Sequence, residues 1–163
     1  MKILISILLT ISTPIGAFAA GSSGTQTPEP TKSTSTEAPT TTSAKKTLSS
    51  QLESVNELLK AKEYNKALSE LVVLDKEFTN NADINNLLGF ASRNLGQFSQ
   101  SARYYTKALQ INPNHIGALE YQGELFVKTN KLKAAKKNLA KLKQLCGTNC
   151  DEYRDLKKAI ASR

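Results

Sequence analysis

The amino-acid sequence predicts an all-α fold, a right-handed solenoid of three helical hairpins and a C-terminal capping helix behind a disordered linker. From Leu48 onward, apolar residues recur at steps of three and four, which is the spacing of amphipathic helices. The pattern returns with an offset of 34 residues, and periods of this size are typical of stacked repeats. Pro113 is the only proline after the linker, and no apolar–polar alternation predicts a strand.

The first twenty residues have the layout of a secretory signal. Lys2 supplies a positive start, residues 3–11 form the apolar centre, and Ala17 and Ala19 place small side chains where a signal peptidase reads them. We expect residues 1–19 to be cleaved before Ala20, so that the protein is periplasmic or secreted. The alternative is an uncleaved membrane anchor, but the apolar run is shorter than the roughly 20 residues that span a bilayer.

Residues 20–46 consist almost entirely of Thr, Ser, Pro, Gly and other small residues. Such a segment buries too little apolar surface to offset the entropy of ordering, so we expect a disordered linker. A spacer, or a stalk that carries sugars on Ser and Thr, is one interpretation. A solvated tail without a partner accounts for the same composition and is favoured.

The predicted domain, residues 47–163, divides into units 48–81, 82–115 and 116–149 and a capping helix 151–161. Equivalent positions in the three units carry residues of similar character. Gly96 and Asn130 fall at the expected turns within hairpins, where a left-handed residue is commonly needed. The coinciding positions are Tyr64, Phe98 and Leu132; Ala67, Ser101 and Ala135; Leu71, Tyr105 and Leu139; and Leu74, Ala108 and Leu142.

This pattern resembles the tetratricopeptide-repeat (TPR) family, whose unit is a pair of antiparallel helices. The second unit carries the resemblance most fully, in Leu88, Gly89, Gly96, Phe98, Ser101, Tyr105, Ala108 and Pro113. The sequence departs from the family at two positions of each unit. The usual Trp is replaced by Gln51, Asn85 and Leu119, and a usual Tyr by Leu58, Ser92 and Phe126.

The end of the chain, LCGTNCDEYRDLKKAI, resembles the ending of small exported proteobacterial TPR proteins. Tyr153, Leu156 and Ile160 are spaced to face the stack, whereas Lys157 would block a further hairpin, so this segment is expected to cap the solenoid. Cys146 and Cys150 are expected to form a disulfide after export. A redox dithiol and a metal site remain alternatives, the latter needing ligands from a second chain.

The resemblance implies that a partner peptide lies in a concave groove lined by the first helix of each unit. Phe90 is expected to be exposed there and to anchor the peptide together with Arg93. Because the residues of the family's carboxylate clamp are largely replaced, we do not expect this groove to clamp a terminal carboxylate. The predicted groove residues are Asn56, Asn86, Phe90, Arg93, Asn94, Glu124 and Lys128.

Lysine is concentrated in the third unit, where no acidic residue occurs between Leu125 and Cys150, and the whole chain carries a formal charge of +8. These lysines predict either a solvated surface or a face that docks weakly on anionic lipid or glycan. Nucleic acid is not expected as a partner, because no aromatic residue interleaves the lysines. The predicted basic face comprises Lys131, Lys133, Lys136, Lys137, Lys141 and Lys143.

No local motif predicts catalysis. His115 is the only histidine, and the paired carboxylates, such as Asp75 with Glu77, are expected on solvated helix faces. We therefore expect no enzymatic activity, no catalytic or metal-binding residue and no cofactor. The leading hypothesis is an exported adaptor or scaffold that holds a protein or peptide partner in the cell envelope, and the alternative is an envelope factor that docks through the lysines.

Overall fold

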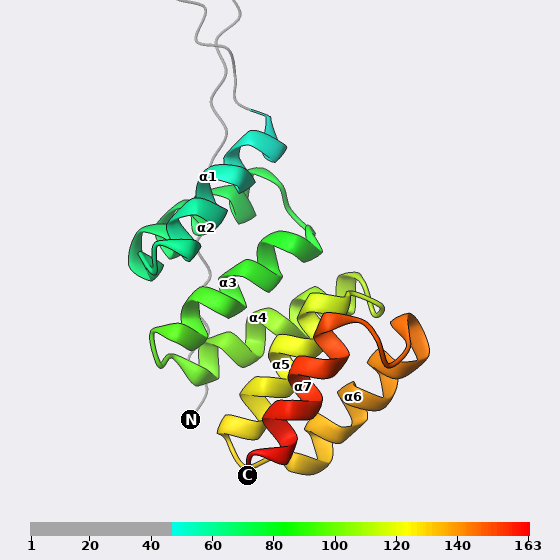
Figure 1. Cartoon of the computed structure of the whole chain (residues 1–163). Coiled ribbons are helices and arrows are strands. Elements are labelled where there is room, and N and C mark those ends of the chain that lie inside the picture. The colour runs from blue at the N-terminus through cyan, green and yellow to red at the C-terminus, as the bar shows by residue number, and fades with distance from the viewer. Residues whose placement is uncertain (1–46) are drawn as a thin grey trace, which may run out of the picture. The chain divides into compact units, whose positions relative to one another are not determined.

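The computed structural model describes residues 47–163; the expected signal peptide and the whole of the expected linker lie outside the described residues. The described part contains seven α-helices and no strand, which confirms the predicted solenoid of three hairpins and a capping helix (Figure 1). The helices are α1 (Leu48–Lys60), α2 (Tyr64–Glu77), α3 (Ala82–Asn94), α4 (Phe98–Ile111), α5 (Ile116–Lys128), α6 (Leu132–Cys146) and α7 (Asp151–Ala161). None of these helices is long and apolar enough to cross a membrane.

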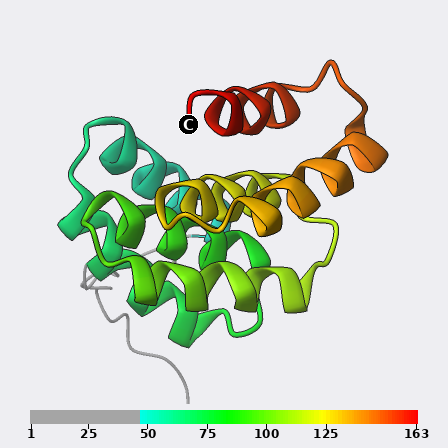
Figure 2. The same ribbon diagram turned by 90° about the horizontal axis from the view of Figure 1, so that it is seen from below.

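The helices of the described domain pack with their neighbours along the chain, and each hairpin also packs on the next. Helix α3 contacts α2, α4 and α5, whereas α5 contacts α3, α4, α6 and α7. Figure 2 shows α4 and α7 on opposite sides of α5. Helix α5 is therefore central to the second half of the domain, because it contacts the second hairpin, its own partner helix α6 and the capping helix α7.

The turn inside each hairpin is closed in the same way. Lys62, Gly96 and Asn130 have φ values of 61°, 76° and 58°, in the left-handed region. At each turn the N–H of the following residue donates to a carbonyl five residues back, with N···O distances of 2.7–2.9 Å. This 6→1 bond is characteristic of a Schellman motif, and it satisfies a helix-end carbonyl that would otherwise have no partner. The expectation of left-handed residues at Gly96 and Asn130 is confirmed.

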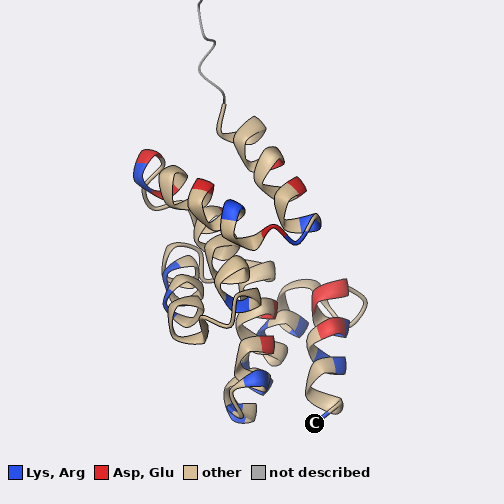
Figure 3. Ribbon diagram, turned by 90° about the vertical axis from the view of Figure 1, so that its left-hand side faces the viewer, with Lys and Arg blue, Asp and Glu red and all other residues tan. Residues whose placement is uncertain are grey.

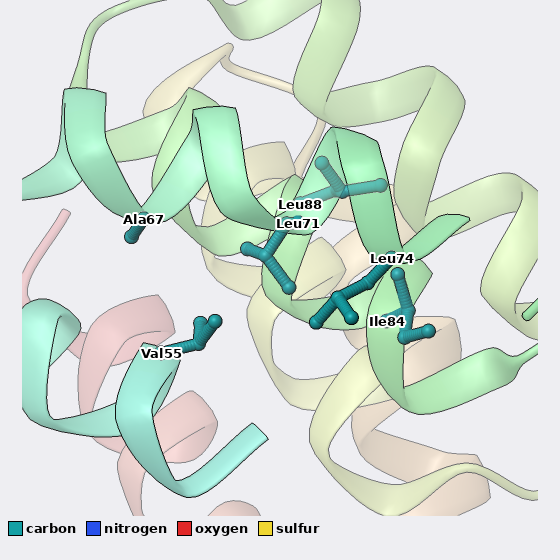
Figure 4. Close-up of a cluster of buried hydrophobic side chains, with 6 residues drawn as sticks. All are labelled: Val55, Ala67, Leu71, Leu74, Ile84 and Leu88. Carbon is teal, nitrogen blue, oxygen red and sulfur yellow. The ribbon is translucent and has the colours of Figure 1, made fainter. Parts of the chain in front are cut away.

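The first core joins α1, α2 and α3. Figure 4 shows Leu71 and Leu74 of α2 beside Ile84 and Leu88 of α3, with Val55 of α1 on the other side. All five side chains are at most 3% exposed. Fully burying an aliphatic side chain contributes about 1.5–3 kcal/mol, so this cluster supplies much of the cohesion between the first two hairpins.

Two glycines at equivalent repeat positions allow different side chains to pack against their helices. A Cβ atom at Gly89 would lie 2.5 Å from Cε1 of Tyr105, inside the same hairpin. A Cβ atom at Gly123 would lie 2.5 Å from Cδ2 of Leu156, in the capping helix. Both distances are shorter than real Cβ contacts, so each glycine is needed for close helix packing. Because Gly123 has no side chain, α7 can pack closely on α5 at this position.

Asp75 is not on a solvated face, contrary to the sequence-based expectation. Its carboxylate is partly buried and accepts a hydrogen bond from Asn85 Nδ2 at 2.9 Å and another from Lys107 Nζ at 3.0 Å. These partners come from α3 and α4, which sequence spacing alone does not bring to α2. The contact ties the first hairpin to the second.

Helix α7 caps the solenoid as predicted. Leu156 is fully buried, and Tyr153 and Ile160 pack against the second core, which is formed by Leu119, Val127, Ala135, Leu142 and Leu156. Cys146 and Cys150 are bonded to each other, with Cα atoms 5.9 Å apart, across the short turn that leads into α7. Export of the protein, and formation of this bond after export, stay predictions.

A candidate peptide-binding groove

A pocket of about 210 Å³ opens between the first helices of the three hairpins. Its wall combines apolar and aromatic side chains with a few polar ones, as is usual for ligand-binding pockets. Each of α1, α3 and α5 contributes to it, so the pocket exists only when the hairpins are stacked. The lining residues are Asn56, Leu59, Lys60, Leu87, Phe90 and Tyr121.

Phe90 is half-buried, which corrects the expectation that it would be exposed. Its ring centroid lies 6.3 Å from that of Tyr64 in α2 and 5.0 Å from that of Tyr121 in α5. Aromatic pairs at such distances contribute about 0.5–1.5 kcal/mol beyond simple burial. Phe90 therefore forms part of the pocket wall and offers only one side of its ring to a ligand.

Arg93 is 9% exposed and interacts within the domain. Its guanidinium carbon lies 5.5 Å from the centroid of Phe90 and 5.3 Å from that of Tyr121, within cation–π range. The same guanidinium forms an ion pair with Glu124 of α5. The structure thus joins two predicted groove residues to each other, and the expected contact of Arg93 with a peptide is replaced by a role in holding the wall together.

Of the other predicted groove residues, Asn56 lines the pocket, whereas Asn86, Asn94 and Lys128 do not. Asn56 is exposed and lines the pocket, and Asn94 is exposed but donates from Nδ2 to the Phe90 carbonyl at 2.9 Å. Asn86 is 7% exposed, and its Oδ1 has no hydrogen-bond partner among the described residues. Lys128 does not line the pocket; its Nζ lies 5.9 Å from the ring centroid of Phe98 in α4.

Leu87 and Tyr121 line the pocket but were absent from the predicted groove residues. The sequence signal that could have identified both residues is their repeat position, because each lies in the first helix of its unit and the two units are neighbours. Their apolar and aromatic character is what makes the pocket suited to a side chain rather than to a carboxylate.

Several acidic residues of α5 and α7 influence one another and Tyr121. Glu120 is 7% exposed, and burial, assisted by the carboxylates of Glu124, Asp155 and Glu152, raises its pKa to about 8. Burial also raises the pKa of Tyr121, with the Glu120 carboxylate adding to the effect. We call Glu120, Glu124, Glu152 and Asp155 the acidic cluster.

The six lysines of the predicted basic face make no ion pair within the described domain. Five of them are exposed, and Lys141 is half-buried. A shallow pocket of about 350 Å³ lies among Lys131, Lys133 and Lys137, beside Leu132, which is 37% exposed. The surface is strongly cationic and includes one accessible apolar side chain.

His115 begins α5 as its N-cap. Its Nδ1 accepts a hydrogen bond from the Ala118 N–H at 3.1 Å, and its Nε2 lies 3.0 Å from Asp83 Oδ1. An Nδ1 that accepts places the proton of the neutral ring on Nε2, from which it donates to Asp83. This geometry gives the histidine a structural role at the junction of the second and third units.

The structure adds a third potential ligand to the two cysteines. The carboxylate of Glu152 and the sulfur atoms of Cys146 and Cys150 all lie within 4.8 Å of one another. With the sulfurs bonded to each other, no thiolate is available for a metal ion, because a metal ligates the deprotonated thiol.

Stacked antiparallel helix pairs define a helical-repeat class of domain. Residues 82–115 match the model of the tetratricopeptide repeat family. The "First TPR of Spaghetti (RPAP3) bound to HSP90 peptide SRMEEVD" superposes with a TM-score of 0.62, at 19% identity over 69% of this chain and 90% of that one. The Arabidopsis OM64 TPR domain gives 0.63, at 22% identity over 70% and 93%. Residues 82–115 are thus similar to a tetratricopeptide repeat, and the described domain has the fold of these tetratricopeptide-repeat structures.

Two further similarities are to a second solved complex and to a curated protein. PcrH in complex with the chaperone binding region of PopD gives a TM-score of 0.60, at 16% identity over 71% of this chain and 86% of that one. Among curated proteins, the uncharacterized protein ycf37 of Pyropia yezoensis is 39% identical over 54 residues, which is 33% of this chain and 30% of the relative. The match thus spans less than a third of that relative's length.

Proposed function

We propose that this protein is an exported, non-enzymatic adaptor that holds a peptide segment of a protein partner in the pocket between α1, α3 and α5. The observation that carries the proposal is the pocket itself, with apolar and aromatic residues from three helices. Two structural neighbours are described as complexes with a peptide or a binding region of a partner, which supports this mode of action.

The pocket is suited to a single apolar side chain. Leu59, Leu87 and Phe90 are each half-buried, so each presents part of its apolar surface inside the pocket. Burying an aliphatic side chain there would contribute about 1.5–3 kcal/mol, and main-chain hydrogen bonds would fix the direction of the peptide. The exposed amide of Asn56 is placed at the wall to supply such a bond.

Panning a random 12-residue peptide display library on the protein tests the proposal. Enriched peptides are then synthesised and their affinities measured by calorimetry for the wild type, for Leu87→Ala and for Asn56→Trp. The first variant removes a wall residue and the second fills the pocket. We expect each to weaken binding at least tenfold, whereas Val73→Ala, at a 61% exposed side chain on α2, leaves it unchanged.

Peptides that bind both pocket variants as tightly as the wild type would show that the binding site lies elsewhere. Circular dichroism of each variant verifies that the helices remain folded. Failure to enrich any peptide over an empty-surface control would remove the support for a peptide-holding role.

A second candidate function is docking on anionic lipid or glycan through the basic face, and the unpaired, exposed lysines favour it. Each lysine near an anionic bilayer contributes about 1 kcal/mol, and the attraction fades within about 8 Å at physiological ionic strength. Sedimentation with phosphatidylglycerol vesicles tests it. We expect binding at 50 mM salt to be lost at 500 mM and in the triple variant Lys133→Glu, Lys136→Glu, Lys137→Glu; binding unchanged by both would exclude this function.

Export and the state of the cysteines are part of the proposal. Amino-terminal sequencing of protein from the cell envelope is expected to begin at Ala20, and a sequence that retains Lys2 would refute cleavage. The mass of the native protein is expected to rise by about two hydrogen atoms on reduction as the bond between Cys146 and Cys150 opens, and alkylation of both thiols before reduction would refute the disulfide.

A further inference from the structure

The edge of the solenoid at which α4 and α6 begin carries apolar and cationic side chains together. We propose, as a refinement that rests on the second candidate function, that this edge docks on an anionic phospholipid bilayer and inserts the side chains of Phe98 and Leu132 among the lipid headgroups. We call it the docking edge, and it comprises Phe98, Lys128, Lys131, Leu132, Lys133 and Lys137.

The two apolar side chains of the docking edge occupy equivalent places in neighbouring hairpins. Phe98 is the first residue of α4 and Leu132 is the first residue of α6, each directly after the turn inside its hairpin. Because the hairpins are stacked repeats, equivalent residues lie along the same edge of the stack. Phe98 is 38% exposed and Leu132 37%, and Val73 is the one other large apolar side chain that is exposed among the described residues.

Lys131 joins the two apolar side chains into one continuous surface. It lines a pocket of about 110 Å³ that includes Phe98, and it also lines the pocket of about 350 Å³ that includes Leu132. Lys128 lies on the same surface, because its Nζ is 5.9 Å from the ring centroid of Phe98. Figure 3 shows basic segments of the chain, in blue, at the lower end of the domain, where α5 is followed by α6 in Figure 1.

The positive charge of the docking edge is not neutralised within the described domain. Its four lysines are all exposed, and none of them forms an ion pair with a described residue. No acidic residue occurs in the sequence between Leu125 and Cys150. The first hairpin differs, because Lys66 pairs with Glu63 at its turn and the equivalent Tyr64 is half-buried. The docking edge is therefore confined to the second and third hairpins.

An anionic bilayer can interact favourably with both kinds of side chain. Its surface charge attracts lysines, and the binding of an interfacial protein surface strengthens with the apolar area that it buries among the lipids. A polyanionic glycan carries the same sign of charge but has no apolar phase, so Phe98 and Leu132 would gain little from contact with it. The combination of unpaired lysines with exposed apolar side chains therefore favours lipid over glycan.

Tryptophan fluorescence tests insertion directly, because the chain contains no tryptophan of its own. Leu132→Trp is compared with Val73→Trp, whose site on α2 is 61% exposed and lies outside the docking edge. Vesicles of phosphatidylglycerol and phosphatidylcholine are added to the full chain at 50 mM salt. We expect blue-shifted emission from Leu132→Trp, with quenching by lipids brominated on their acyl chains, and neither effect in Val73→Trp.

Sedimentation with the same vesicles measures what the apolar side chains contribute to affinity. The double variant Phe98→Ser, Leu132→Ser should bind vesicles about tenfold more weakly than the wild type, because the apolar surface available for insertion is removed. Its binding to dextran sulfate, a polyanionic glycan, should be unchanged. Val73→Ser is the matched control and should alter neither affinity. Circular dichroism verifies that the helices remain folded, and the tryptophan comparison decides alone if the double variant unfolds.

The outcomes separate this refinement from the function on which it rests. Unshifted emission from Leu132→Trp, or equal vesicle affinity of the wild type and a folded double variant, would overturn insertion and leave docking through charge alone. Absence of wild-type binding to the vesicles would overturn both. Binding to dextran sulfate that weakens with the double variant as much as vesicle binding does would make glycan the occupant and would also overturn the assignment. The peptide pocket shares no residue with the docking edge, so these outcomes leave the peptide-holding proposal unaffected.

Discussion

The buried carboxyl group of Glu120 makes the stability of the domain depend on pH. Its pKa rises from 4.5 to about 8 on folding, first because burial penalises the charged form and then because Glu124, Asp155 and Glu152 repel it. The folded domain therefore holds a proton on Glu120 that the unfolded chain releases between these two values. This stabilising contribution is complete below pH 4.5 and is lost as the pH rises through about 8.

The size of this pH dependence follows from the shift in the pKa of Glu120. Each pKa unit corresponds to about 1.4 kcal/mol, which sets an upper value of about 5 kcal/mol for the full shift. Asp155 is exposed and Glu152 half-buried, so water screens their part of the repulsion. We expect the free energy of unfolding to fall by about 2–3 kcal/mol from this group between pH 5 and pH 9.

Urea denaturation of the wild type and of Glu120→Gln, followed by circular dichroism at pH 5, 7 and 9, measures this contribution. The amide does not ionise, so the variant should lose this part of the pH dependence and should exceed the wild type in stability at pH 9. The control variant Glu53→Gln, at an exposed residue of α1, should keep the wild-type profile. Parallel profiles for wild type and Glu120→Gln would refute the reasoning.

Three further predictions concern packing, backbone and capping. Gly123→Ala should destabilise the domain by about 1–3 kcal/mol and loosen the packing of α7 on α5. The loosening should appear as faster hydrogen exchange in residues 151–161. Unchanged exchange would mean that Leu156 moves aside at no energetic cost. Lys62→Gly should stabilise it by about 0.5–1 kcal/mol, because φ is 61° there, and a lower midpoint of thermal unfolding would contradict this. His115→Ala should cost about 1 kcal/mol by removing the cap of α5, whereas His115→Asn should restore most of the loss; equal losses in urea denaturation would show that the cap is not the cause.

The repeat could be predicted from sequence because its signals are local. Small residues recur at fixed spacing along the chain, and turn residues such as Gly96 and Asn130 act within one hairpin. The same reasoning could not predict that Phe90 is half-buried. Its neighbours Tyr64 and Tyr121 lie 26 residues before it and 31 residues after it, on helices whose crossing positions depend on packing.

The predicted groove illustrates the same limit. Repeat positions identified the helices that form it and included Asn56 and Phe90, which line the pocket. They also included Arg93 and Glu124, which the structure pairs with each other. A repeat position predicts on which side of a helix a residue lies. It does not predict whether a side chain from the next unit forms an ion pair with that residue.

The sequence by itself determined the all-α class, the 34-residue register and the capping role of the last helix, because periodic burial of apolar side chains depends on spacing along the chain. Only the tertiary structure decided the pocket wall, the ion pair of Arg93 and the acidic cluster around Glu120. These features join α1, α3, α5 and α7, and electrostatic energy depends on distances across helices that no sequence spacing sets.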